Sequence, residues 1–327
     1  MANQFRPNEI ELNTKKRART SKHSVHAHRR ILPYLALLPA VIAIAFVQVI
    51  PTFFGVIISM LKLTQFTIGN WIQAPFAALQ NFWLAVNVGQ PIGRELFVSL
   101  GVTCAYTVVV VGVSWILGMA AAVFLTDQFR GRGWLRSLFI LPYALPAYVG
   151  VMVWTFMFQP NGSVNSLLGK DLHLISPGTF WLAGIRAFVA IAITAIWRTW
   201  PFAFLMLLAG MQDIPQELYE AARVDGASRW KEFWGITLPS VRNVSLLLVL
   251  ITGFWTFTDF TTPFVMFSTS PPVAARLMSL QIYVDSFVNL NFGLGAAMSV
   301  IMVLFLLIIA TVYIRVFRMR IGEMHNG

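Results

Sequence analysis

Charge is scarce in this sequence, and its scarcity excludes the commonest class of protein. Charged residues make up 11% of the chain and hydrophobic residues make up 57%. A soluble globular domain has about 25% charged and roughly 45–50% apolar residues. The composition therefore indicates an integral membrane protein. Its organisation is found by counting membrane spans, each of which needs about 20 mostly apolar residues.

Cysteine and the common catalytic motifs are also missing. The single cysteine, Cys104, lies inside an apolar run, which excludes a disulfide framework and a thiolate metal cluster. The stretch HSVHAH at 23–28 has no cysteine or carboxylate nearby, so no metal site is predicted. The chain has no HExxH, GxSxG or GxxxxGK[ST] pattern and no histidine inside an apolar run. We expect neither an enzyme nor an ATPase.

Long apolar runs predict an all-α, polytopic protein with six transmembrane helices. The first run is far longer than the apolar part of a signal peptide, about 7–15 residues, and it follows a polar tail of some thirty residues. It is therefore expected to remain as a membrane helix. The predicted spans are Ile31–Leu61, Leu96–Thr126, Leu135–Phe158, Phe180–Met211, Val241–Phe267 and Leu294–Phe317.

Lysine and arginine set the predicted orientation. With a cytoplasmic N-terminus, 18 of the 24 basic residues fall on the cytoplasmic side and 4 on the other. The positive-inside rule then places both termini in the cytoplasm. The predicted parts are a basic, disordered tail at 1–30, a six-span domain at 31–318 with a cytoplasmic loop at 212–240, and a second cytoplasmic tail at 319–327. Anionic lipid accounts for the net charge of +11, so no nucleic-acid partner is predicted.

The charged stretch LYEAARVDGASRWKEFWGITLP, at 218–239, interrupts this apolar chain. It predicts a helix at 217–225, a break at Gly226 and a second short helix at 227–235. The second helix brings Trp230, Phe233 and Trp234 close to one face. One interpretation is a compact knob that docks on another protein. The other is a surface loop whose aromatic residues lie in the membrane interface.

The stretch resembles the EAA loop of permease subunits of bacterial ATP-binding-cassette (ABC) importers. The matching positions are Glu220, Ala221, Ala222, Gly226, Ile236, Leu238 and Pro239. Two longer segments, FRGRGWLRSLFILPYALPAYVGVMVWTFMF and TAIWRTWPFAFLMLLAGMQDIPQELYEAARVDGAS, are similar to the sugar-permease branch, particularly its maltose and glycerol-phosphate types. The loop at 62–95 is too short for the large extracytoplasmic insertion of the maltose type.

The resemblance implies a function and a set of partners. It implies a subunit of the bacterial cytoplasmic (inner) membrane that moves a carbohydrate or a sugar-like polyol derivative inward by ATP-driven alternating access. It also implies a second homologous permease, two ATPase subunits that bind ATP and Mg, and an extracytoplasmic substrate-binding protein. The residues implied to couple to the ATPase are Glu220, Ala221, Ala222, Gly226, Ile236 and Pro239.

Two ionisable residues inside the spans indicate a substrate pathway, because such groups usually face protein interior or a wet cavity. Arg198 and Asp259 lie at similar depths, roughly 22 and 27 Å from the inner ends of their spans at about 1.5 Å per residue. Thr252, Thr256 and Asp259 are predicted to fall at i, i+4 and i+7 on one helical face, with Trp255 beside them. The same positions of these two spans carry the substrate site in the maltose-type subunit, so the resemblance implies a substrate site here. The predicted pathway residues are Arg198, Thr199, Phe202, Thr252, Trp255, Thr256 and Asp259.

Two alternatives remain open at this site. Arg198 and Asp259 either contact substrate or pair with each other as a clamp between helices. Asp259 is also the position that an ion-coupled secondary transporter would use as its coupling site. That function leaves the EAA-like loop unexplained, and the sequence shows no internal repeat of the kind that such transporters often contain.

Overall fold

The structure is a computed structural model that describes residues 36–126, 128–176 and 178–317. The tails predicted at 1–30 and 319–327 lie outside these residues. The described chain is helical and contains no strand beyond one isolated bridge between Leu61 and Phe76. Five helices are long and apolar enough to cross a membrane, and a sixth span is formed if one bent pair is counted. The all-α membrane fold is confirmed.

The long helices, in chain order, are α2 (Ile50–Ser59), α4 (Pro91–Thr126), α5 (Arg132–Ala144), α6 (Ala147–Met157), α8 (Arg186–Gln212), α12 (Arg242–Phe257) and α15 (Phe292–Phe317). Shorter α-helices are α3 (Gln80–Val86), α7 (Ser163–Asn165), α9 (Gln216–Val224), α10 (Arg229–Glu232), α11 (Leu238–Ser240), α13 (Thr261–Phe267) and α14 (Met278–Tyr283). Short 3₁₀ and π segments are η1 (Ala45–Val49), η2 (Ile68–Gln73), η3 (Ser166–Asp171), η4 (Phe233–Thr237), η5 (Val273–Ala275) and η6 (Val284–Val288).

The chain divides into two compact units, Met1–Ile57 and Ile58–Gly327. The described part of the first unit belongs to the candidate span Ala36–Ser59. Large apolar side chains are exposed along this span, among them Phe46, Val47 and Phe53. A helix that is apolar all round is typical of a membrane span.

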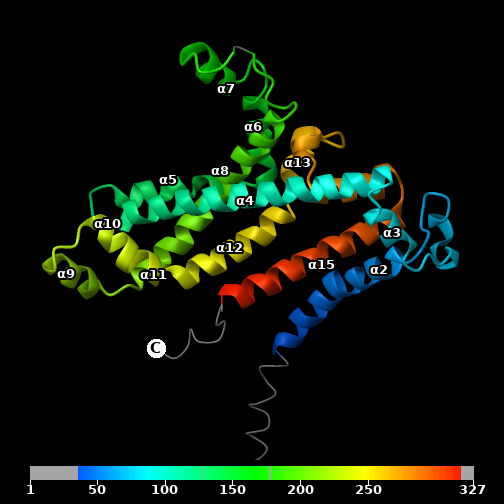
Figure 1. The fold of residues 1–327 in the computed structure, drawn as a ribbon, viewed down its shortest axis with the longest axis horizontal. Coiled ribbons are helices and arrows are strands. Elements are labelled where there is room, and N and C mark those ends of the chain that lie inside the picture. The colour runs from blue at the N-terminus through cyan, green and yellow to red at the C-terminus, as the bar shows by residue number, and fades with distance from the viewer. Residues whose placement is uncertain (1–35, 127, 177, 318–327) are drawn as a thin grey trace, which may run out of the picture. The chain divides into compact units, whose positions relative to one another are not determined.

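The second unit is built around the long helices α4 and α8, which have the most extensive contact of any helix pair in it (Figure 1). Small residues allow this close approach. A Cβ atom added at Gly118 of α4 would lie 2.7 Å from the backbone nitrogen of Phe204 on α8. Small residues at helix contacts are a common device in membrane proteins, because the backbones can then come close together. Helices α12 and α15 also belong to this unit, and α12 contacts both α4 and α8.

The third predicted span, Leu135–Phe158, is not one straight helix. Helices α5 and α6 meet at a bend of 91° (Figure 1). The cause is Pro146, which has no N–H to donate and keeps the preceding residue out of the helical region. Leu145 accordingly has extended angles, φ −78° and ψ 141°. The sequence prediction missed this break, although the segment LPYALPAY contains the proline that causes it.

The fourth and fifth spans also differ from their predictions. Helix α8 begins at Arg186 rather than at Phe180. In the fifth span, α12 ends at Phe257 and α13 begins at Thr261, so Asp259 lies in a short non-helical link. The prediction that Thr252, Thr256 and Asp259 share one continuous helical face is therefore wrong. The break instead gives the Asp259 side chain access to backbone and side-chain donors on several elements.

Candidate functional site

A cavity of about 500 Å³ lies between α8 and α12, beside the bend between α5 and α6. Its walls come from four parts of the chain: the end of α5, the start of α6, the middle of α8, and the end of α12 with the link that follows. The lining residues are Tyr143, Leu145, Ala147, Ala195, Arg198, Thr199, Phe202, Trp255, Thr256 and Asp259. The structure thus brings six of the seven predicted pathway residues to one cavity.

Asp259 is the most highly connected polar group of this cavity. One carboxylate oxygen, Oδ2, accepts from the Tyr106 hydroxyl at 2.8 Å, the Thr262 hydroxyl at 2.5 Å and Arg198 Nη2 at 3.4 Å. The other oxygen, Oδ1, accepts from the backbone N–H of Thr262 at 3.2 Å. The residue is 8% exposed. A buried carboxylate is stable only with such partners, so its position is firmly fixed.

Arg198 is paired and still open to the cavity. Its guanidinium forms the ion pair with Asp259, and its side chain remains 23% exposed. The second terminal nitrogen, Nη1, is buried and has no hydrogen-bond partner among the residues that the structure describes. An unmet guanidinium donor is costly unless something else accepts from it. Arg198 and Asp259 can therefore pair with each other and also line the cavity, because the Arg198 side chain stays partly exposed while it is paired.

Aromatic rings form another part of the wall. The ring centroids of Phe202 and Trp255 are 4.9 Å apart, and those of Tyr143 and Phe202 are 5.8 Å apart. Trp255 is 51% exposed, so part of its indole surface is open. A cavity with a few polar groups among aromatic side chains is the usual form of a site for a small molecule.

Thr252 is the predicted residue that does not reach the cavity. It is buried, and its hydroxyl donates to the carbonyl of Leu248 within α12 at 2.7 Å. Tyr106, Thr262 and Tyr143 were not predicted from the sequence. A charged residue stands out inside an apolar run, whereas a tyrosine or threonine hydroxyl gives no comparable signal until its partner is known.

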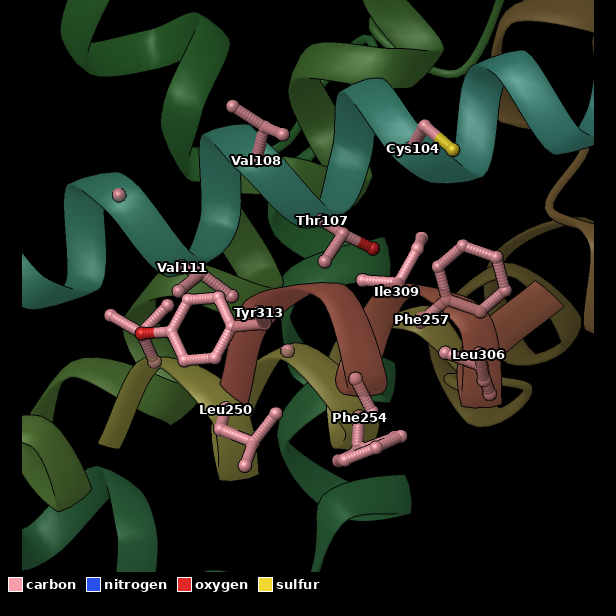
Figure 2. Close-up of a pocket in the computed structure, with 14 residues that line it drawn as sticks. Cys104, Thr107, Val108, Val111, Leu250, Phe254, Phe257, Leu306, Ile309 and Tyr313 are labelled. Carbon is pink, nitrogen blue, oxygen red and sulfur yellow. The ribbon is translucent and has the colours of Figure 1, made fainter. Parts of the chain in front are cut away.

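A second cavity shows what an apolar site in this bundle looks like. It has a volume of about 380 Å³ and lies among α4, α12 and α15 (Figure 2). Its walls include Val108, Leu250, Phe254 and Ile309, and the hydroxyl of Tyr313 donates to the Leu246 carbonyl at 3.0 Å. The lining carries no charged side chain. Of these two cavities, the first offers the mixture of donors, acceptors and rings that a polar small molecule needs.

The EAA-like stretch forms a helical hairpin, which we call the knob and which comprises residues 216–240. Helix α9 ends in a left-handed turn at Gly226, φ 76°. The N–H of Ala227 bonds the carbonyl of Ala222 and the N–H of Gly226 bonds that of Arg223, which is the hydrogen-bond pattern of a glycine-capped helix end. Two side-chain contacts join the halves: Arg223 Nε donates to Glu232 at 3.0 Å, and the hydroxyls of Tyr219 and Thr237 are 3.0 Å apart.

The surface of the knob carries exposed residues of two kinds. Glu220, Ala221 and Gly226 are exposed, as are the apolar side chains of Leu218 and Val224. Trp230, Phe233 and Trp234 pack against one another with ring centroids 5.4–6.2 Å apart, which confirms that they cluster. Ala222 and Ile236 are partly buried, and Pro239 is exposed.

A buried carboxylate also lies outside the membrane spans, at Asp285 in η6. It accepts from Gln281 Nε2 at 2.8 Å and from Asn289 Nδ2 at 2.9 Å. Burial raises the pKa of Asp285 above its ordinary value, these two hydrogen bonds lower it in part, and Glu95 adds a further small increase. Gln281 also donates to Glu95, which pairs with Arg276 at 3.3 Å. This network links the start of α4 to the segment before α15.

These features define a polytopic α-helical membrane protein with a charged, aromatic cavity between broken spans and a structured loop at 216–240. The family described as "Binding-protein-dependent transport system inner membrane component" matches residues 114–322. The chain belongs to this family of inner-membrane permease components.

Individual relatives agree with this assignment. The "Trehalose/maltose transport system permease protein MalF" of Thermococcus litoralis is 32% identical over 291 residues, which cover 88% of this chain and 94% of the relative. The "sn-glycerol-3-phosphate transport system permease protein UgpA" of Agrobacterium fabrum is 29% identical over 303 residues, covering 91% and 98%. These relatives confirm the predicted resemblance to ABC permeases.

A solved structure has the same fold. One chain of a bacterial ABC transporter involved in the import of the acidic polysaccharide alginate matches with a TM-score of 0.69 at 20% identity. The match covers 92% of this chain and 100% of that chain.

Proposed function

We propose that this chain is the permease subunit of an ABC importer for a carbohydrate or a sugar-like polyol derivative. The observation that carries the proposal is the cavity at Arg198 and Asp259. Substrate hydroxyls would contact the exposed part of the Arg198 side chain, and ring faces would pack on the exposed surface of Trp255. The relatives named above are permease proteins for trehalose or maltose and for glycerol 3-phosphate.

We propose that the knob binds an ATPase subunit. The knob connects the end of α8 to the start of α12. Its conformation is fixed by the left-handed turn at Gly226 and by the ion pair between Arg223 and Glu232, so it would move as a rigid unit. Both helices line the cavity, so movement of the knob would be transmitted to its walls. In this proposal Glu220, Ala221, Ala222, Gly226, Ile236 and Pro239 contact an ATPase subunit, and ATP and Mg are bound there. The full assembly would contain a second homologous permease, two ATPase subunits and an extracytoplasmic binding protein.

Ion coupling through Asp259 is the weaker alternative. A cation site needs carboxylate oxygens that are free to coordinate, and both oxygens of Asp259 already accept hydrogen bonds. The proposed transport step instead uses Asp259 to orient Arg198 and the link between α12 and α13.

Uptake by the reconstituted complex tests the proposal. Proteoliposomes would contain this permease with its partner permease and ATPase subunits, and the binding protein loaded with labelled sugar would be added on the opposite side. We expect uptake only when ATP and Mg are present on the ATPase side. Uptake that follows a proton or sodium gradient without ATP would overturn the proposal and favour the ion-coupled alternative. A panel of neutral and anionic sugars offered to the binding protein would then define the substrate class.

A further inference from the structure

The second half of the knob carries an aromatic cluster that the proposed contact with the ATPase does not use. The cluster consists of Trp230, Phe233 and Trp234, of which Trp230 is 69% exposed and Trp234 is 52% exposed. Arg229 and Lys231, on the short helix α10, are exposed beside it. Exposed apolar patches with a polar rim mark sites of interaction with a protein or a membrane. This cluster therefore needs a partner of its own.

A groove of about 480 Å³ separates the aromatic cluster from the end of α4, and we call it the α4 groove. One of its walls belongs to α4 and consists of Trp115, Ile116, Met119, Ala120 and Val123. The other wall belongs to the knob and consists of the aromatic cluster, Leu238 and Arg229. Helix α10 accordingly lies near the end of α4 (Figure 1).

The length of the α4 groove matches the depth of one membrane leaflet. Its wall on α4 runs from Trp115 to Val123, which is roughly 12 Å of helix at about 1.5 Å per residue. Half of a hydrocarbon core of roughly 30 Å is about 15 Å. Val123 lies close to the end of α4 at Thr126, on the predicted cytoplasmic side. One acyl chain of the cytoplasmic leaflet therefore fits along this wall.

The charge of the α4 groove lies at its membrane-surface end. Arg229 also lines a neighbouring pocket together with Val123, Thr126 and Gln128, which places its side chain at the end of α4. Among the described residues that line the groove there is no acidic side chain. The carboxylate of Glu232, on the same short helix, is buried and pairs with Arg223 at 3.0 Å.

These features match a phospholipid better than a further helix. A guanidinium is suited to donate to phosphate oxygens, and basic pockets between helices on the cytoplasmic side hold anionic lipid headgroups. Tryptophan is enriched at the same depth of the membrane. A neighbouring apolar helix, about 10–12 Å across with its side chains, would set hydrocarbon against Arg229. A phospholipid instead places its phosphate at Arg229 and its acyl chain on the apolar wall.

We propose that the α4 groove binds one anionic phospholipid of the cytoplasmic leaflet. Its phosphate contacts Arg229, and one acyl chain lies on Ile116, Ala120 and Val123. The bound lipid joins α4 to the second half of the knob, whereas the exposed residues of α9 remain available to a protein partner. This site goes beyond the proposed function and depends on neither the sugar nor ATP.

A photoactivatable phospholipid tests the site in the complete transporter. The transporter would be reconstituted in nanodiscs with phosphatidylglycerol that carries a diazirine in its acyl chain, and adducts would be located by proteolysis and mass spectrometry. We expect adducts within 115–123 of α4. Phosphatidylglycerol without the diazirine should displace the probe several-fold better than phosphatidylcholine does. Inorganic phosphate in solution should not displace it.

Variants separate a specific site from general attraction to the membrane. Arg229→Gln should lower the preference for phosphatidylglycerol about five-fold, the effect of one basic residue near an anionic surface. Lys231→Gln is the matched control, because it removes the same charge from a side chain that does not line the groove, and it should keep the native preference. Ala120→Phe and Ile116→Trp fill the groove from two positions. Each should reduce the adducts on α4 several-fold and leave those near the exposed Leu304 of α15 unchanged.

Several results would overturn the inference. Equal displacement by the two phospholipids, or an equal loss of preference in Arg229→Gln and Lys231→Gln, would show general attraction without a specific site. Displacement by inorganic phosphate would indicate a site for a free anion. Native labelling in both groove-filling variants would show that no acyl chain occupies the groove. The displacement measurement uses the native chain, so a folding defect in a variant does not affect it.

Discussion

Replacing Asp259 by asparagine separates the two roles that the structure gives to this residue. The change keeps the shape of the side chain and removes its charge, which leaves Arg198 without its counter-ion. Breaking a fully buried ion pair costs about 3–5 kcal/mol. Arg198 is 23% exposed and its distance from Asp259 is 3.4 Å, so solvent screens part of this cost. We expect Asp259→Asn to lower the free energy of unfolding by about 2 kcal/mol, the range of a lost charge-assisted hydrogen bond.

A double-mutant cycle measures the pairing directly. Thermal unfolding of the purified complex and its yield from membranes would be compared for Asp259→Asn, Arg198→Gln and the double variant. Residues of one ion pair show coupling of about 0.5–3 kcal/mol. We therefore expect the double variant to be more stable than the sum of the two single changes predicts. Additive effects would show that the two side chains do not act as a pair.

The same variants report on the cavity. Asp259→Asn should also change the apparent affinity for sugar, because Arg198 is no longer held in one orientation. Thr252→Val is the matched control. Thr252 is buried one helical turn before Thr256, which lines the cavity, and its hydroxyl donates to carbonyls of its own helix. Its uptake kinetics should equal those of the native protein. If Asp259→Asn keeps both native stability and native uptake, the assignment of this cavity is wrong.

Three further predictions concern other parts of the chain. Gly226→Val should release the ATPase subunit or uncouple ATP hydrolysis from uptake, because a β-branched residue is strained at φ 76°. Gly226→Asn should retain activity, since asparagine tolerates this region of backbone angles. Equal activity of the two variants in an uptake assay would contradict this prediction. Trp255→Ala should raise the KM for uptake with little loss of stability, about 0.5–1.5 kcal/mol from its contact with Phe202, and an unchanged KM would remove Trp255 from the pathway. Burial raises the pKa of Asp285, so the contribution of this residue to stability is largest at low pH and is lost as pH rises through the raised pKa. Asp285→Asn should therefore flatten a plot of melting temperature against pH over that range. An unchanged slope would show that another group titrates there.

The local features of the knob could be predicted from sequence because they depend on near neighbours. Good helix formers before Gly226, and the break at Gly226 itself, predicted the two short helices and the turn between them. The aromatic cluster followed from the spacing of Trp230, Phe233 and Trp234 along one helix. In each case the contact is made within four residues, so the helical repeat alone determines it.

The partners of Asp259 could not be predicted, because they depend on long-range packing. Tyr106 is 153 residues away in sequence, and its hydroxyl meets the carboxylate only after α4, α8 and the link after α12 have come together. The link itself was missed because the apolar run continues through Phe267 without a strong break, and composition does not reveal that α12 ends at Phe257. Arg198 could be predicted as a pathway residue because a charged residue inside an apolar run is visible in the sequence without any knowledge of packing.

ATP hydrolysis and sugar uptake, measured together in one preparation of proteoliposomes, test the central claim most directly. The complete complex would be compared with one in which this chain carries Gly226→Val. The account predicts that sugar-loaded binding protein stimulates both hydrolysis and uptake in the native complex, in a fixed ratio. It predicts that uptake is lost in the variant, whether or not hydrolysis continues. Uptake that persists at the native rate in the variant, or that proceeds in the native complex without ATP, would contradict the account.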